Sequence, residues 1–198
     1  TGAELPPSSV LDYKLGTLTN NNSIANGGVV MSASSNINSF TNASSCLFDL
    51  NDKTLNVYGA TFTNSGTLNA SASNARLGFI GISPQSLTNG TLISGYISNV
   101  TVNNPAGFTF NNSTQIGSTS SNGNLNLING SATLASGTTL TTFGTFSGSG
   151  TLISASNNAS ISLQGSAGSM GTINLNAGAQ TFPNFTMNVS GTSPNVVI

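Results

Sequence analysis

The chain has 198 residues and carries only seven formal charges, three from Lys or Arg and four from Asp or Glu. Asparagine, serine, threonine and glycine make up 109 of the 198 residues, whereas about a quarter of the residues in an ordinary domain are charged. With three cations and no histidine, the chain lacks both a basic patch for nucleic acid and the usual catalytic and metal-binding side chains. We therefore expect no nucleic-acid partner, no enzyme activity, no metal and no cofactor.

The composition nevertheless predicts a folded protein. The chain is 36% hydrophobic and nearly neutral, and disorder usually accompanies low hydrophobicity with high net charge. No apolar run approaches the eighteen residues that a membrane span requires, so we expect no membrane span. We interpret the sequence as a mature chain at an extracellular cell surface.

The first residues have a pattern of their own. After a Pro-Pro pair, Leu11, Tyr13 and Leu15 alternate with charged residues, which places three apolar side chains on one face of a strand. We treat residues 1–18 as an N-terminal tail and residues 19–198 as a β-rich head domain. The tail strand either joins its own sheet or completes the sheet of a neighbouring copy by β-strand addition. In the second case Leu11, Tyr13 and Leu15 are the donor-strand residues.

Short runs of strand-forming residues recur along the remaining chain, separated by Asn-Gly, Ser-Gly, Gly-Ser and Asn-Asn pairs. This pattern is typical of an all-β protein. Residues 47–50 and 54–58 are predicted to form a hairpin with Asn51, Asp52 and Lys53 at its tip. The further strands are expected at residues 91–97, 100–102, 108–110, 124–128, 138–146, 151–155, 160–164, 172–176 and 181–189.

Two architectures fit these strands. The tripeptide Gly-Thr-Leu begins at residues 16, 66, 90 and 150, with Gly-Thr-Ile at 171, and a solenoid usually shows a steadier period. Strand spacings of roughly 8–12 residues are typical of an antiparallel sandwich. We expect an antiparallel β-sandwich of pilin or immunoglobulin type with an N-terminal extension strand; the alternative is a β-solenoid.

Two resemblances accompany these architectures. Residues 61–70, which read TFTNSGTLNA, are similar in texture to coils of filamentous-haemagglutinin-type β-helix passengers. The near-chargeless composition and the Pro-bounded first strand resemble subunits of archaeal threads and related donor-strand filaments. The second resemblance implies a structural subunit of an extracellular filament that polymerises with copies of itself and carries N-glycans. The alternative function is a β-solenoid adhesin or passenger segment that binds surfaces or glycans.

Asn-X-Ser/Thr sequences are numerous, about as many as the composition would give by chance. Each is a possible N-glycosylation site in a host that has the pathway. The asparagines are Asn21, Asn42, Asn69, Asn89, Asn99, Asn111, Asn112, Asn129, Asn158, Asn184 and Asn188.

The scarcity of charge has two physical consequences. Uncharged strand edges recruit other chains, so such edges need to be paired, covered or used in an assembly. A chain with few titrating groups also has little protonation linkage to drive acid denaturation. Stability is therefore expected to change little down to acidic pH.

Overall fold

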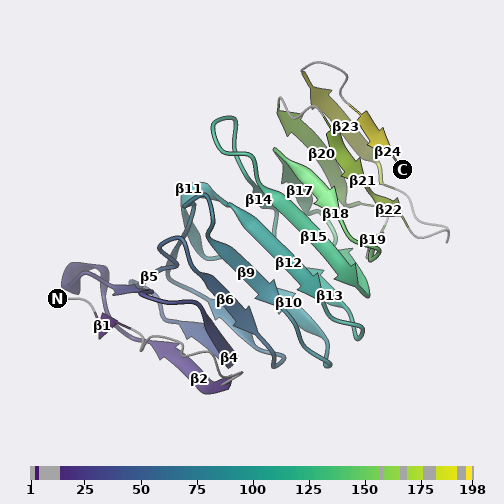
Figure 1. Cartoon of the computed structure of the whole chain (residues 1–198). Helices are drawn as coiled ribbons and strands as arrows, with labels where there is room; N and C mark the ends of the chain where they lie inside the picture. The colour runs from purple at the N-terminus through teal and green to yellow at the C-terminus, as the bar shows by residue number, and fades with distance from the viewer. Residues whose placement is uncertain are drawn as a thin grey trace.

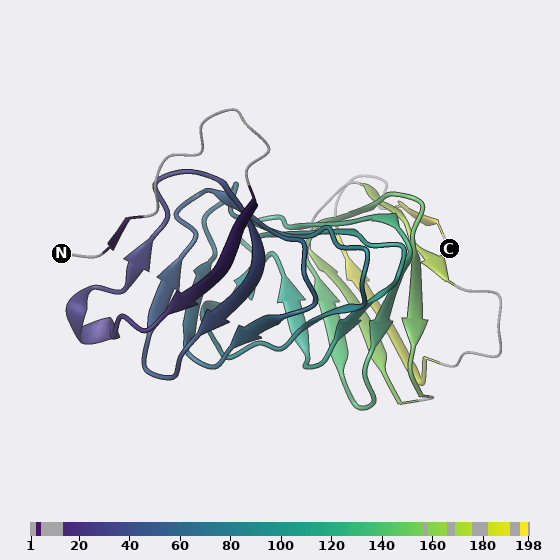
Figure 2. The same ribbon diagram turned by 90° about the horizontal axis from the view of Figure 1, so that it is seen from below.

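The chain folds into a β-solenoid, in which successive coils stack along one axis (Figure 1). The computed structural model describes residues 3–4, 14–156, 158–165, 169–175, 182–190 and 195–197. Three sheets run along the axis, and a full coil passes from sheet A to sheet B to sheet C and back to sheet A. Figure 2 shows the same stack from below, with the first and last described strands at its opposite ends.

Each sheet collects one strand from nearly every coil that it spans. Sheet A contains β1 (Ala3–Glu4), β3 (Val29–Val30), β5 (Leu47–Asp49), β8 (Thr67–Ala70), β11 (Thr91–Ile97), β14 (Thr114–Ile116), β17 (Thr139–Thr142), β20 (Ser160–Gly165) and β23 (Asn184–Val189). Sheet B contains β2 (Lys14–Asn20), β4 (Ser35–Asn42), β6 (Thr54–Val57), β9 (Arg76–Phe79), β12 (Asn99–Asn103), β15 (Asn124–Asn129), β18 (Thr145–Ser147), β21 (Ser169–Thr172) and β24 (Asn195–Val197), with β7 (Phe62–Asn64) paired to β4. Sheet C contains β10 (Gln85–Leu87), β13 (Phe108–Phe110), β16 (Ser131–Leu134), β19 (Thr151–Ser154) and β22 (Asn174–Leu175).

The expected antiparallel sandwich is wrong, and the alternative β-solenoid is correct. Each ladder between these strands is parallel, as between β6, β9 and β12. The physical reason for the error is that a strand with one buried face alternates in the same way in both architectures. The alternating residues of β6, β13 and β19 therefore predicted these strands without giving their direction.

The solenoid has coils of unequal length, which hides its period in the sequence. One inward-facing column of sheet B consists of Ile37, Val57, Phe79 and Val102, at steps of 20, 22 and 23 residues. The tripeptides at Gly66 and Gly90 do lie one coil apart, because Thr67 pairs with Thr91. The tripeptide at residue 16 belongs to sheet B and the one at residue 150 adjoins sheet C, so their spacing carries no repeat.

The core between the sheets is apolar along its length. In the first coils six phenylalanine rings form a continuous chain with centroid distances of 4.5–5.5 Å between neighbours, favourable for aromatic packing. These are Phe40, Phe48, Phe62, Phe79, Phe108 and Phe110. Leucine and isoleucine take over in later coils, where Leu140 and Ile161 face inward in register.

A ladder of buried amides lies at the corner that enters sheet A. Asn20 Nδ2 donates to Asn42 Oδ1, and Asn42 Nδ2 donates to Asn64 Oδ1, both at 2.8 Å. Asn42 Nδ2 also donates to the carbonyl oxygen of Thr67 at 2.9 Å. Within the described residues the ladder ends at a gap, since Asn64 Nδ2 and Asn89 Oδ1 are buried without partners. The amides hold successive corners in register, because each one bonds to the coil above or below it.

Most of the predicted strands are present, with three corrections. The stretch predicted at 172–176 is divided between the end of β21 in sheet B and β22 in sheet C. Residues 47–49 and 54–57 do form strands on either side of a turn, but they belong to sheets A and B and do not pair as a hairpin. The stretch 138–146 forms two strands, β17 and β18, separated by a corner at Phe143 and Gly144. Among the described residues the helix Ile24–Asn26 is a single 3-10 turn, and no helix is long and apolar enough to cross a membrane.

Candidate functional site

Two of the irregular parts of the solenoid lie where sheet A turns into sheet B, here called the A–B corner. In β11, Leu92 pairs with Leu68 of β8 and Ile97 pairs with Ala70. Four residues of β11 therefore lie between two pairs that are separated by a single residue in β8. The extra residues bulge outward: Ile93 is exposed, and Ser94 and Gly95 have positive φ. The bulge is tied back by Tyr96, whose hydroxyl donates to the carbonyl oxygen of Ser71 at 3.2 Å.

A loop at residues 117–123 occupies the same corner on the next coil and projects beyond β14 (Figure 1). Ser118 and Ser121 exchange two backbone hydrogen bonds, of 2.7 and 3.2 Å, which close the loop on itself. The backbone of Gly144 lies against that of Gly123, leaving no space for a side chain at either position. The loop is therefore built on rigid backbone contacts, as a binding loop on a scaffold would be.

An open groove of about 290 Å³ borders this loop. Thr119 lies at one side of it, and Phe143, Gln164 and Asn188 line it from three successive coils. Phe143 and Gln164 are half-buried, whereas Thr119 and Asn188 are exposed. The remaining lining residues are Gly165 and Ser190.

Local geometry fixes the groove residues. Phe143 follows β17 and donates its backbone N–H to Ile116 at 2.9 Å, while Gln164 Nε2 donates to Ser162 Oγ at 2.8 Å. Gly165 has a φ of +110°, which favours glycine, and its carbonyl accepts the backbone N–H of Ser190 at 2.8 Å. The groove is thus lined by one aromatic residue among residues with amides and hydroxyls, which suits a ligand with one apolar face and several hydroxyls.

The groove carries no charge. Arg76 is the last charged residue of the sequence, and it lies in β9, three strand steps from β18 in sheet B. Three steps correspond to roughly 14 Å, and the two steps from β9 to β15, which follows Thr119, to roughly 10 Å. Both separations exceed the Debye length of about 8 Å at physiological salt. The groove therefore offers no ionic contact to a ligand.

The donor-strand candidates are only partly described. Leu11 and Tyr13 lie outside the described residues. Leu15 lies in β2, pairs with Ile37 of β4 and packs partly buried against the core of its own chain. The expected boundary between tail and head at residue 18 falls within β2.

The candidate glycosylation sites differ in accessibility. Asn42 is 0% exposed and belongs to the buried ladder. Nδ2 of Asn89, of Asn99 and of Asn111 each donates a hydrogen bond to a neighbouring coil, and Asn69 is half-buried. The exposed candidates are Asn21, Asn111, Asn112, Asn129, Asn158, Asn184 and Asn188.

The acidic residues do not converge. Among the described residues no three Asp, Glu, His or Cys side chains are placed to hold a metal ion. Asp52 accepts hydrogen bonds from the side chain and the backbone N–H of Asn74, which lower the pKa of its carboxyl below the ordinary value. This carboxylate thus fixes a turn between adjacent coils.

Little in the sequence indicates the groove. Phe143 was expected inside one continuous strand, and Gln164 at the end of another. The signal that could have located the corner is Gly144, because an isolated glycine within a strand pattern indicates a bend or a close backbone approach. The alignment of Phe143 with Gln164 and Asn188 depends on coil lengths that the sequence does not show.

Comparison of the chain with protein-family models, with curated proteins and with solved structures gives no match.

Proposed function

We propose that this chain is a β-solenoid segment of an extracellular adhesin, a rod that binds surfaces or glycans through its A–B corner. The observation that carries the proposal is the clustering of the β11 bulge, the 117–123 loop and the groove at one corner of the stack, on successive coils. In solenoids, insertions on one face often form the binding face. The uncharged composition supports an extracellular location, where glycans would cover part of the exposed surface.

The filament hypothesis has less support than the adhesin. From Lys14 onward the strand expected to be donated pairs along β4 of its own chain, from Lys14–Asn36 to Asn20–Asn42. Releasing β2 would break this ladder and expose Leu15 and Leu18, which pack against the core. Donation would therefore have to compensate for an intramolecular pairing that already exists.

Adhesion to coated beads tests the proposal. The fluorescently labelled chain is incubated with beads that carry a neutral polysaccharide, an anionic polysaccharide or albumin, and with uncoated beads. We expect retention on at least one polysaccharide. The double variant Ile93→Asp, Thr119→Asp, which adds charge to the tips of the corner, should reduce retention at least about tenfold, because each charge must lose hydration on contact.

The matched control is Ser86→Asp with Thr133→Asp, two outward-facing positions on sheet C. This variant should be retained like the wild type. Equal loss in both variants would show that charge anywhere on the rod prevents adhesion, and no retention of the wild type on any bead would overturn the proposed function.

A further inference from the structure

We infer that the groove at the A–B corner is a binding subsite for an uncharged saccharide, with one sugar ring stacked on Phe143 and its hydroxyls bonded to Gln164 and Asn188. The inference rests on the proposed function and specifies its ligand. It begins from the alignment of the three residues. Thr142 pairs with Leu163 and Gln164 pairs with Asn188, so Phe143, Gln164 and Asn188 succeed one another along the axis.

The dimensions favour a short extended ligand along that axis. Adjacent strands lie about 4.8 Å apart, so the line from Phe143 to Asn188 spans roughly 10 Å. Gly165 leaves the groove open beside Phe143, since a Cβ at position 165 would lie 3.2 Å from the Phe143 carbonyl oxygen. Thr119 and Ser190 add hydroxyls at the borders of the groove.

The chemistry favours a saccharide. Phe143 is half-buried and lines the groove, so a sugar ring can pack against the part of it that stays accessible. The amides of half-buried Gln164 and exposed Asn188 both donate and accept hydrogen bonds. Gln164 is held by its bond to Ser162 Oγ, so less side-chain freedom is lost on binding. A fully apolar ligand would leave these amides without partners.

The electrostatics favour an uncharged saccharide. The strand that carries Arg76 lies roughly 10 to 14 Å along the stack from the groove, beyond a Debye length, so no cation is placed to pair with a sulfate or a carboxylate. Transfer of an anionic sugar into the groove would cost hydration without a compensating ion pair. Affinity for the correct ligand should consequently be independent of salt concentration.

One acceptor asparagine bears on the design of the experiment. Asn188 begins the sequence Asn-Val-Ser and lines the groove, so a glycan attached there would compete with a bound saccharide. The protein is therefore produced in a host without N-glycosylation. Binding of neutral gluco-, manno- and galacto-oligosaccharides and of their sulfated counterparts is then measured by calorimetry at low and at high salt.

We expect the wild type to bind one neutral series with equal affinity at both salt concentrations and its sulfated counterpart more weakly. Phe143→Ala should weaken binding about tenfold, in line with the loss of one aromatic stack, and Phe143→Tyr should restore it. Thr141→Ala, outward-facing on the same strand but outside the groove, is the control and should bind normally. Unfolding temperatures identify any variant that fails to fold.

Three outcomes would overturn the inference: unchanged binding by Phe143→Ala, a preference for sulfated sugars that weakens with salt, or no binding of any oligosaccharide. In each case the adhesin function would still be supported if the wild type is retained on beads and the double variant Ile93→Asp, Thr119→Asp is not. If the wild type is retained on none of the beads, the proposed function itself is contradicted.

Discussion

At the scale of single residues, the buried asparagines explain how an uncharged chain fixes the register of its coils. Asn42 accepts one side-chain hydrogen bond and donates two, all within the protein. A buried amide with unsatisfied groups costs about 1–3 kcal/mol for each group. A coil that slipped by one residue would lose these bonds together, so the ladder favours one alignment.

Replacement of Asn42 by alanine tests the ladder. Asn20 Nδ2 would keep its bond to the Leu47 carbonyl, but Asn64 Oδ1 and the Thr67 carbonyl would lose a donor. We expect a loss of about 3 kcal/mol, or roughly 6–12 °C in Tm for a chain of this size. Asn111→Ala, which removes one exposed bond to Thr88, should cost less than about 1 kcal/mol. Equal losses in thermal unfolding would contradict a special role for the buried amides.

The same ladder makes a prediction about modification. If the chain is produced in a host with N-glycosylation, Asn42 should remain unmodified in the folded protein, because both hydrogens of its Nδ2 are engaged within the buried ladder. Asn112 is exposed and should be the more accessible acceptor. Glycopeptide mass spectrometry measures occupancy at both positions, and a glycan on Asn42 of the folded protein would contradict the ladder.

The lowered pKa of Asp52 leads us to expect a small decrease of Tm at acidic pH. Its pKa is lowered by the hydrogen bonds from Asn74, so the carboxylate stabilises the fold above its ordinary value of 3.8. This contribution is lost as the pH falls through the lower pKa of the folded state. We expect a constant Tm from neutral pH to about pH 5 and a small decline below pH 4. Asp52→Asn, which tolerates the φ of 65° at this position, should flatten the decline, and circular dichroism at each pH measures both proteins. A steeper decline in the variant would contradict the sign.

At the scale of elements, the close packing of Gly144 against Gly123 sets the corner that carries Phe143. Gly144→Ala would place its Cβ inside the space of the Gly123 carbonyl, and neither backbone can move without breaking the bond from Thr145 N to Gly123 O. We expect a loss of at least about 2 kcal/mol. Gly16→Ala, in an open position of β2, is the control and should be neutral or slightly stabilising. Equal Tm values for the two variants would contradict the close contact.

The strands also show which features of the fold could be predicted from the sequence. The bounds of β11 and β13 were predicted as observed, because alternating side chains and flanking glycines act locally. The direction of pairing was predicted wrongly, because it depends on which coil lies beside which, and corners of unequal length conceal that order. The groove was missed for the same reason, since Phe143 and Gln164 meet only after a full coil.

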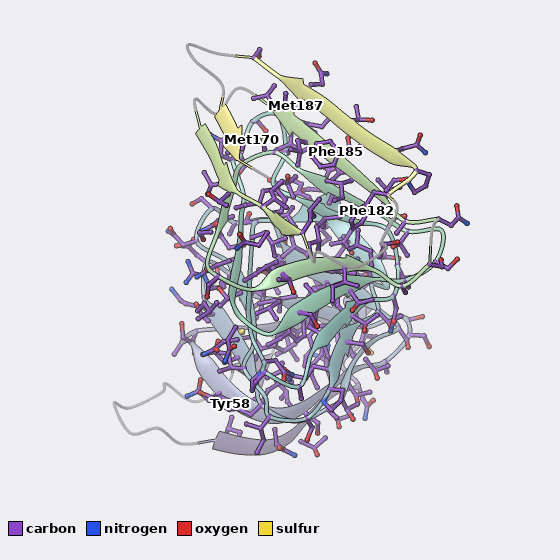
Figure 3. All side chains as sticks on the ribbon, turned by 90° about the vertical axis from the view of Figure 1, so that its right-hand side faces the viewer. Tyr58, Met170, Phe182, Phe185 and Met187 are labelled. Atoms are coloured by element: carbon purple, nitrogen blue, oxygen red, sulfur yellow. The ribbon has the colours of Figure 1, made fainter. Side chains whose placement is uncertain are left out.

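At the scale of the whole molecule, the last coil of the part that the structure describes leaves some of its inward-facing side chains exposed. Phe185 and Met187 of β23 continue the inward-facing columns of Ile161 and Leu163, yet they are 36% and 61% exposed. Figure 3 looks onto this end, where Phe182, Phe185 and Met187 lie on the last coils. In a solenoid each coil is stabilised mainly by its neighbours, so a coil with one neighbour is the weakest.

This gradient can be measured with a pair of substitutions in one column. Leu163→Ser places a hydroxyl in the buried interior and should cost about 3–5 kcal/mol, whereas Met187→Ser removes a mostly exposed side chain and should cost less than about 1 kcal/mol. Hydrogen exchange should show the amides of β23 exchanging faster than those of β17, which has neighbours on both sides. Leu163→Met and Met187→Leu control for side-chain identity and should both be mild. Losses of equal size at the two serine variants would mean that the end of the stack is covered in solution, because only a covered Met187 contributes as much as a residue inside the core.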